Sequence, residues 1–564
     1  MKTQIQKNID NIYAKKNIWK LSLKTVVPSL LLTLLFGIYI FVDQMLIVNL
    51  VPQDGHNYIE IFFKNNNKLE LYQKVSSYIN ENPGINLSVS NSVNDFIAFP
   101  TSNLIGPFSL IVLSFGYLIS AGGAVLFSKY LSINNEELQK KIIWNSFYAS
   151  LIFGLIATVI MILIQNPLLK SMVPSSNNLE VSGNNTTGIT ESDLKKYFNT
   201  YYLGVVDQAN QYIYWINAGI LFSCLNNLLV FYLRAEGKNL WVTLFGVFSN
   251  ILNIVFDIIL ICVIKIGIMG GGIATFIGQA INLVSLISYL IYLNIKNLTI
   301  IRLSILKINK NLFDLKMIWT SVVLGSSTFL RELSLAIANI IYVPVFMNTM
   351  GAIDVVALAS FGKVVASPIY NLFFFSIFGI IDGMRPIISY NYSQKNYHRV
   401  KQGYWIGLLT AIVYSFIVIS FSFSIIPYNN QLLKSLNAIT DFDKQNLFIL
   451  FLSMMWQFPF ISLSIGGLAL FQSTNKKIAN VVLSLMQGTI TFYPILFIMS
   501  SIAQSSQNVN IMVFTGFTNI AISSLIIFIC SLLFIKFLES DKVWLSFKTS
   551  LVNKFKNNNK KNNN

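Results

Sequence analysis

The stretch that decides the fold is TVVPSLLLTLLFGIYIFVDQMLIVNLV, residues 25–51. It is apolar over more than the roughly 20 residues that a helix needs to cross the hydrocarbon core of a membrane. A cleavable signal peptide is not expected here, because the apolar region is too long and no small-residue cleavage site follows it. One carboxylate, Asp43, stands inside the run. The stretch therefore predicts a membrane-spanning helix that carries a single acid.

Eleven further runs of the same kind follow along the chain. They cover residues 102–127, 142–164, 212–233, 240–264, 270–293, 317–346, 355–381, 404–426, 447–471, 478–502 and 512–534. Backbone groups in lipid must be hydrogen-bonded within each span, and strands of a β-barrel would be half as long and alternate in polarity. The sequence therefore predicts an all-α integral membrane protein with twelve transmembrane helices.

Composition and charge agree with this class of protein. Hydrophobic residues make up 54% of the chain and charged residues 11%, whereas a soluble domain carries roughly 25% charged residues. With the N-terminus placed inside, 29 of the 40 Lys and Arg residues fall on inner segments and nine on outer segments. Inner loops of membrane proteins are enriched in these residues, so we expect a plasma-membrane protein with both termini in the cytoplasm. The net charge of +17 then reflects inner loops and predicts no nucleic-acid partner.

The sequence offers little for metal or nucleotide chemistry. Its three cysteines lie in apolar runs with no spacing typical of a disulfide framework or a metal site. Only two histidines are present, which argues against a His-ligated metal. No GxxxxGK[ST] loop occurs. We therefore expect no cofactor and no enzymatic activity, and transport driven by an ion or substrate gradient.

An internal repeat divides the chain. SKYLSINNEELQKK begins at Ser128, and SYNYSQKNYHRVK begins at Ser389, 261 positions later. Each segment follows the second helix of its half, so we expect two six-helix bundles related by a pseudo-two-fold axis along the membrane normal, with a cavity between them.

The repeat and the polar segments set the expected organisation. The predicted parts are an N-terminal six-helix half over residues 1–297, a cytoplasmic linker over 298–316, a C-terminal six-helix half over 317–540 and a basic cytoplasmic tail over 541–564. Two outer insertions, about 52–101 and 165–211, are polar and rich in Asn and Ser. We interpret them as solvated segments, with a role as lids as the alternative.

Several motifs stand on the expected helices in a particular order. They read LRAEGKN at 233–239, NILNIVFDIIL at 250–260, GIMGGGIATFIGQ at 267–279 and GMRPIISYNYSQKNYHRV at 383–400, and the first span has Pro28 early and Asp43 late. Together they resemble the multidrug and toxic compound extrusion (MATE) family over roughly residues 24–534, apart from the two insertions. Ser393 and Gln394 stand where the family pattern has Gly-Ala.

This resemblance implies a secondary active exporter that works by alternating access. Na⁺ or H⁺ enters, and an amphipathic, often cationic organic compound leaves; the partners are such small molecules and membrane lipids, and a monomer suffices. A flippase for lipid-linked substrates of the same superfamily is the nearest alternative, but it needs several basic cavity residues and only Arg331 and Lys363 are candidates. A membrane-bound enzyme would need clustered His, Asp or Glu at an interface, and the sequence shows no such cluster. A channel fits less well than alternating access, because the buried acids lie at one depth on separate helices.

Acids inside spans are the first candidates for function, because an ionisable group in hydrocarbon is costly unless it faces a cavity or a partner. Asp43 and Asp257 lie about 27 and 25 Å from the inner ends of their expected helices. Asn253 is one turn from Asp257 and shares its face, and Asn250 extends that face. Two nearby carboxylates favour proton capture, and the same oxygens with Asn carbonyls would ligate Na⁺. The resemblance assigns cation coupling to Asp43, Asn253 and Asp257, and a static hydrogen-bond network is the alternative.

Other polar residues inside spans are candidates for a cavity or a cation site. Asn226 or Asn227 on the fourth span is expected near the same network, and Asn227 is the residue we select. Thr275 and Gln279 share one face of the sixth span.

The seventh and eighth spans carry charges of their own. Glu332 matches a cation site in the C-terminal half of some family members, although the tenth span has no acid to complete it. The alternative is that Glu332 and the adjacent Arg331 satisfy nearby groups or each other, although a direct pair is awkward because neighbours on a helix point about 100° apart. For Lys363 we expect a structural role, with its ammonium reaching toward the interface.

Overall fold

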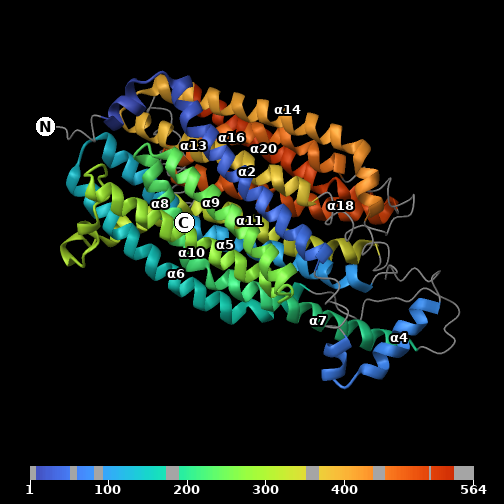
Figure 1. Ribbon diagram of the computed structural model, residues 1–564. Helices are drawn as coiled ribbons and strands as arrows, with labels where there is room; N and C mark the ends of the chain where they lie inside the picture. Colours follow the sequence, from blue (N-terminus) through green and yellow to red (C-terminus); the bar gives the residue numbers. More distant parts are fainter. Residues whose placement is uncertain are drawn as a thin grey trace, which may run out of the picture.

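Long apolar runs without helix breakers become the long helices of the computed structural model (Figure 1). The structure describes residues 8–50, 60–81, 93–172, 190–350, 367–435, 451–474, 476–506, 508 and 510–538, and every regular element in these ranges is helical. In this part of the chain, eleven helices are long and apolar enough to cross a membrane, or twelve if one bent pair counts as a single span. The expected all-α membrane fold is confirmed.

The helices fall into two groups along the chain. The first group is α2 (Ile18–Leu50), α5 (Val93–Ser132), α6 (Glu136–Met172), α7 (Glu191–Ala218), α8 (Ile220–Ala235), α9 (Asn239–Asp257) and α10 (Met269–Ile295). The second group is α11 (Leu315–Met350), α13 (Ser367–Ser393), α14 (Tyr397–Ser435), α16 (Gln457–Ser473), α17 (Lys477–Leu485), α18 (Phe492–Ser506) and α20 (Thr515–Lys536). Short elements are η1 (Asn11–Lys15), α4 (Leu69–Glu81), η3 (Ile258–Val263), η4 (Leu303–Leu306), η5 (Lys310–Leu312), η7 (Met486–Ile490) and α19 (Asn510–Val513).

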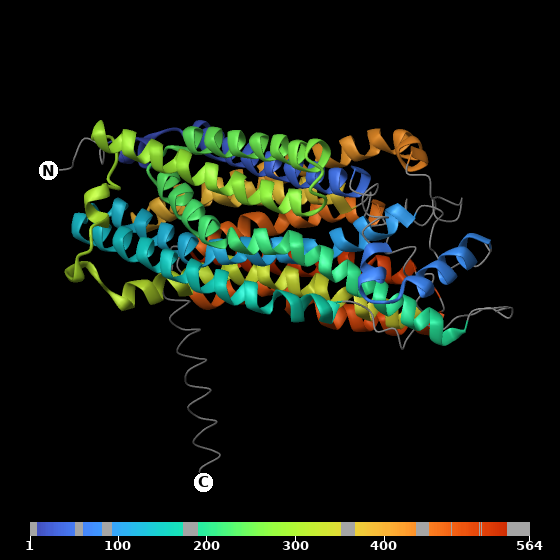
Figure 2. The same ribbon diagram turned by 60° about the horizontal axis from the view of Figure 1, so that its bottom comes forward.

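The two ends of the bundle differ in what they carry. We call the linker end the one where η4 and η5 connect α10 to α11, and where η1 and the α5–α6 turn also lie (Figures 1 and 2). We call the insertion end the opposite one, where α4 and the start of α7 lie (Figures 1 and 2). The expected linker, residues 298–316, covers this connection.

Two helix pairs join the halves, α5 with α11 and α2 with α13. Glycines let these backbones touch. A Cβ on Gly122 would lie 1.8 Å from the carbonyl oxygen of Ser321, and one on Gly325 would lie 1.8 Å from that of Leu118. In the second pair, a Cβ on Gly383 would lie 2.5 Å from the Cα of Val26. Small residues permit close approach of membrane helices where dispersion drives association.

The turns at the linker end repeat between the halves. Asn134 after α5 has φ 54°, and Lys395 after α13 has φ 58°. Their numbers differ by 261 (395 minus 134), which is the offset that the sequence repeat predicts. α6 and α14 begin two residues after these turns, at Glu136 and Tyr397. Both halves therefore reverse direction through a residue in the left-handed conformation at the equivalent position. Asn is enriched in this conformation.

The fourth span begins earlier than expected and is bent. The prediction placed it at residues 212–233, whereas α7 starts at Glu191 and meets α8 at a 42° bend around Gly219. Thr190 caps α7 through a capping box with Asp193, which satisfies two of the free N–H groups at the helix start. A Cβ on Gly219 would lie 2.6 Å from Oε1 of Gln279, so glycine allows the close approach at the bend.

The described parts of the two insertions contact each other. Lys74 pairs with Asp193 at 2.9 Å, and Lys68 donates to Thr200 at 2.8 Å. Phe63 and Tyr197 lie with ring centroids 5.1 Å apart. Hydrogen bonds from Lys74 and Thr190 lower the pKa of Asp193, so this acid remains ionised beside Lys74. Polar composition alone did not reveal the aromatic contacts that order these segments.

The eighth span also differs from its expected range of 355–381, part of which lies outside the described residues. α13 continues to Ser393 because its polar residues find buried partners. Asn391 donates to the carbonyl oxygen of Tyr13 at 3.1 Å, and Tyr390 bonds Asp10. The helix thus continues beyond residue 381, where the apolar run ends, and the polar side chains of Tyr390 and Asn391 contact η1 and the residue before it.

Tyr13 of η1 joins the two halves at the linker end. Its hydroxyl donates to the carbonyl oxygen of Arg234 at 2.7 Å, and its own carbonyl oxygen accepts from Arg399 at 2.9 Å. Burial, with the Glu236 carboxylate nearby, raises the pKa of Tyr13. The phenol therefore stays protonated and keeps donating its hydrogen bond.

Glu236 holds the linker against α8, and its loss is expected to destabilise the protein. Its fully buried carboxylate accepts from the Thr299 hydroxyl at 2.8 Å and the Ile300 N–H at 2.8 Å, and it pairs with Lys238. Glu236→Ala should lower the free energy of unfolding by about 3 kcal/mol, because it leaves a cation and several donors without their acceptor. Chemical denaturation in detergent, followed by tryptophan fluorescence, measures the change.

The matched control is Glu137→Ala. Glu137 is 76% exposed and pairs with Lys141 one turn away, and exposed pairs of this kind contribute little. Equal destabilisation by the two variants would contradict the assignment of Glu236 as the anchor of the linker.

Candidate cation-coupling site

α9 turns one polar face toward the bundle. Its buried residues are Asn239, Val242, Thr243, Gly246, Ser249, Asn253 and Asp257. Asp257 is the last residue of α9, and the chain passes directly from it into the π-helix η3. Short π-helical segments occur frequently at functional sites. Asp257 is fully buried, and neither of its carboxylate oxygens has a hydrogen-bond partner among the described residues.

Asp43 on α2 faces the start of α10. Tyr212 of α7 donates its hydroxyl proton to Oδ2 of Asp43 at 2.5 Å. A Cβ on Gly271 would lie 2.8 Å from Oδ1 of Asp43, so the glycine-rich start of α10 leaves room for the carboxylate. Oδ1 has no partner in the part of the chain that the structure describes.

The two acids belong to one electrostatic neighbourhood. Asp43 and Asp257 interact with each other, and Tyr39 interacts with both. Tyr39 in turn bonds the hydroxyl of Thr275 at 3.0 Å. Thr275 thus lies beside the site through its contact with Tyr39.

Asn253 adds an amide to the same face. A Cβ on Gly278 would lie 3.0 Å from its Nδ2, and its Oδ1 is a further acceptor without a donor among the residues described. Asp43, Asn253 and Asp257 therefore present buried oxygens that exceed the donors around them. A buried carboxylate is costly unless it is protonated or paired with a cation, so this arrangement is suited to binding H⁺ or a hard cation such as Na⁺.

Other candidates lie at different places. Asn250 is only half-buried, and Ser249 occupies the buried face that we expected Asn250 to extend. Asn226 donates to the Gln279 carbonyl oxygen at 2.9 Å, while Oε1 of Gln279 has no partner within the described ranges. Asn227 instead faces α5, where a Cβ on Gly116 would lie 2.4 Å from its Nδ2. The asparagine of α8 that reaches α10 is therefore Asn226.

Glu332 is engaged by its neighbour. Nη2 of Arg331 lies 2.5 Å from Oε1 of Glu332, and both side chains are buried. The two residues therefore form the direct pair that was the awkward alternative, since Nε of Arg331 also donates to Oε1 of Glu332 at 3.0 Å. Lys363 lies outside the described residues.

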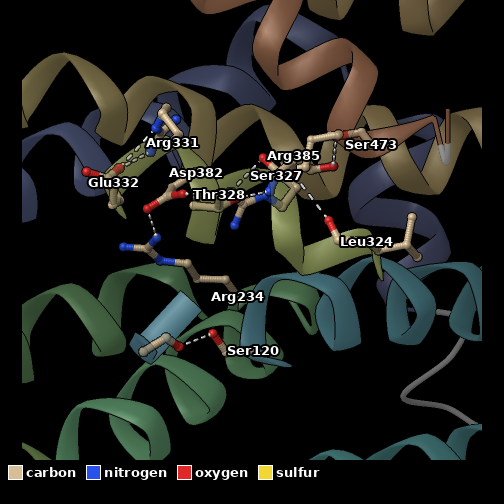
Figure 3. A network of polar contacts seen from close by, with 12 residues as sticks. Ser120, Arg234, Leu324, Ser327, Thr328, Arg331, Glu332, Asp382, Arg385 and Ser473 are labelled. Atoms are coloured by element: carbon tan, nitrogen blue, oxygen red, sulfur yellow. Dashed lines mark hydrogen bonds and ion pairs between the residues drawn. The ribbon is translucent and has the colours of Figure 1, made fainter. Parts of the chain in front are cut away.

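The sequence reasoning missed two groups of residues. The first group is the tyrosines Tyr39 and Tyr212, which flank the acids. The only signal for them in the sequence was their position in the outer parts of apolar runs. The second is an ion-pair cluster between the halves (Figure 3). There Asp382 of α13 lies 3.3 Å from Arg234 of α8 and 3.2 Å from Arg385. The motifs containing Arg234 and Arg385 were the available signal.

Comparisons with known proteins agree with this architecture. Residues 335–466 match the family model MatE. An uncharacterized protein of Mycoplasmoides gallisepticum, the MG447 homolog MYCGA2290, is 26% identical over 90% of this chain and 88% of its own length. Multidrug export protein MepA of Staphylococcus haemolyticus is 22% identical over 70% of this chain and 77% of its own length.

Solved structures share the fold. A multidrug resistance MATE family transporter of the MOP superfamily, in an outward-facing conformation, superposes with a TM-score of 0.68 over 96% of this chain and 99% of that one, at 16% identity. The eleven or twelve candidate spans in the described part of this chain, together with the shared fold, make it a multi-pass membrane protein. Through the family model over residues 335–466, the relatives and the shared fold, the chain is similar to transporters of the MATE family.

Proposed function

We propose that this protein is a secondary active exporter that couples the entry of Na⁺ or H⁺ to the exit of amphipathic, often cationic organic compounds. The observation that carries the proposal is the set of buried oxygens of Asp43, Asn253 and Asp257 that have no donor among the described residues. Buried carboxylates without donors are stabilised by a bound proton or cation, and intramembrane acids typically mark ion pathways.

The proposed coupling of ion entry to transport depends on neutralising the charges of Asp43 and Asp257. Empty, the two acids repel each other in a poorly solvated site, and a proton or cation removes that repulsion. The hydrogen bond from Tyr212 and the contact of Asp43 with Gly271 connect the charge state to the packing of α2, α7 and α10. Rocking of the two halves then alternates access to the cavity between them.

Two names among the relatives support an export role, Multidrug export protein MepA and the multidrug resistance MATE family transporter. The excess of Lys and Arg on inner segments supports a plasma-membrane location with both termini and the linker end in the cytoplasm. In this orientation, the acids lie toward the extracellular side, from which the driving ion enters.

Gradient-driven ethidium efflux tests the proposal. Full-length protein in proteoliposomes should move ethidium when a Na⁺ gradient or a proton gradient is imposed, and one of the two gradients should suffice. The effective gradient identifies the ion. Movement that equals protein-free liposomes under both gradients, with folded protein, would refute export of this class of compound.

A further inference from the structure

The interface between the halves contains arginines that the proposed coupling site does not use. Arg234 of α8 and Arg385 of α13 share one carboxylate, Asp382, at 3.3 and 3.2 Å (Figure 3). Arg385 also donates to Oε1 of Gln472 at 2.9 Å. The three charged residues come from both halves, and their formal charges leave one positive charge in excess.

The neighbouring charges do not remove this excess. Glu332 is bound by Arg331, so its carboxylate is already engaged. Arg234 and Arg385 are 3% and 4% exposed, yet Nε of Arg234 and both Nε and Nη1 of Arg385 have no acceptor in the described part of the chain. Buried donors without acceptors carry a desolvation penalty, which an anionic ligand would relieve.

The surroundings combine this charge with aromatic surface. Arg234, Asp382 and Arg385 line a small cavity together with Phe231. The Arg385 guanidinium lies 4.7 Å from the centre of the Phe231 ring, which stacks with Tyr117 at 5.7 Å. Stacking on an aromatic ring leaves the edge of a guanidinium available for acceptor oxygens.

We propose that Arg234 and Arg385 form a binding site for the carboxylate or phosphate group of an amphipathic solute. The substrates would then include aromatic anions and zwitterions, in addition to cations. This inference rests on the proposed export function, because a site between two rocking halves opens to one side and then to the other. Asp382 occupies the arginines in the present conformation and acts as an internal competitor.

Fluorescein, an aromatic carboxylate, is the probe. Its binding to the full-length protein in an uncharged maltoside detergent is followed by fluorescence anisotropy. Arg385→Gln and Arg234→Gln should each weaken binding about tenfold or more, because each removes a charge-assisted hydrogen bond. Arg302→Gln, at an exposed arginine of the linker, is the matched control and should leave binding unchanged. Equal affinities in all four proteins would overturn the proposal.

A variant with the opposite expected sign separates binding from misfolding. Asp382→Asn removes the internal competitor, so fluorescein should bind about tenfold more tightly. Weaker binding by this variant would identify the cluster as purely structural. Displacement of fluorescein by phenyl phosphate is expected. Displacement by phosphatidylglycerol alone would overturn the assignment to a solute and point to a lipid headgroup.

The binding and transport assays fail independently. Ethidium efflux without fluorescein binding would refute the arginine site and leave the exporter intact. Fluorescein binding that responds to these variants, without gradient-driven efflux of ethidium or fluorescein, would refute the exporter and leave an anion site.

Discussion

Asp43→Asn is expected to reduce gradient-driven efflux about a hundredfold or more while the protein remains folded. Asparagine keeps the size of the side chain and an oxygen that accepts from the Tyr212 hydroxyl, so local packing survives. It cannot bind a transported proton, and it removes a negative charge that would attract Na⁺. Efflux of ethidium from proteoliposomes under the effective gradient measures the loss, and the unfolding midpoint reports the fold.

Asp193→Asn is the matched control, since it makes the same change in an acid at the insertion end that pairs with Lys74. It should retain efflux near the wild-type rate. A static network between α2 and α9 predicts a different pattern for Asp43→Asn, with efflux maintained and stability lowered. That outcome would remove Asp43 from the coupling group.

The sequence predicted the spans and the acid-bearing helices because both depend on local composition. Twelve apolar runs are long enough to cross a membrane, and acids inside such runs are rare enough to draw attention to Asp43 and Asp257. Depth and helical period also predicted that Asp43 and Asp257 would lie close together, with Asn253 on the same face as Asp257. The presence of the tyrosines around them depends on which helices pack together, which composition does not specify.

The structure was needed to identify the helix face on which each polar residue lies and the partners that its side chain contacts. Asn226 and Asn227 differ by one residue, yet the first reaches Gln279 and the second faces α5, since one residue turns a helix by about 100°. Arg385 lies beyond the expected end of its span and was counted as a charge of an inner loop. In the structure, Asp382 and Gln472 provide partners within the protein, so the helix continues with its arginine buried.

The buried charges lie in two separate places. The acids lie within the N-terminal half, on α2 and α9, whereas Arg234, Asp382 and Arg385 join α8 to α13 across the interface. Under the proposed coupling, a cation that loads the acids changes packing inside the N-terminal half. The α5 and α11 backbones approach closely at Gly122 and Gly325, so we expect the proposed movement of the halves to depend on this contact.

Gly122→Leu is expected to lower efflux about tenfold or more by preventing close contact between the halves. Gly122 and Gly325 each lie ten residues from the linker end of their helices, or about 15 Å at the rise of an α-helix. A Cβ at Gly122 would lie 1.8 Å from the Ser321 carbonyl oxygen, which belongs to rigid helical backbone. The leucine therefore forces α5 and α11 apart at this contact.

Gly106→Leu on the same helix is the matched control, because a Cβ there meets nothing within 4 Å. Its efflux should match that of the wild type. Packing inside each half does not involve the α5–α11 contact, so Gly122→Leu should still elute as a monodisperse protein on size exclusion. Wild-type efflux by Gly122→Leu would mean that the working cycle never brings these two backbones into contact. Loss of efflux with the fold retained would identify this glycine contact as the closure that alternating access requires, since a cavity that stays open at the linker end cannot deliver its contents to the other side.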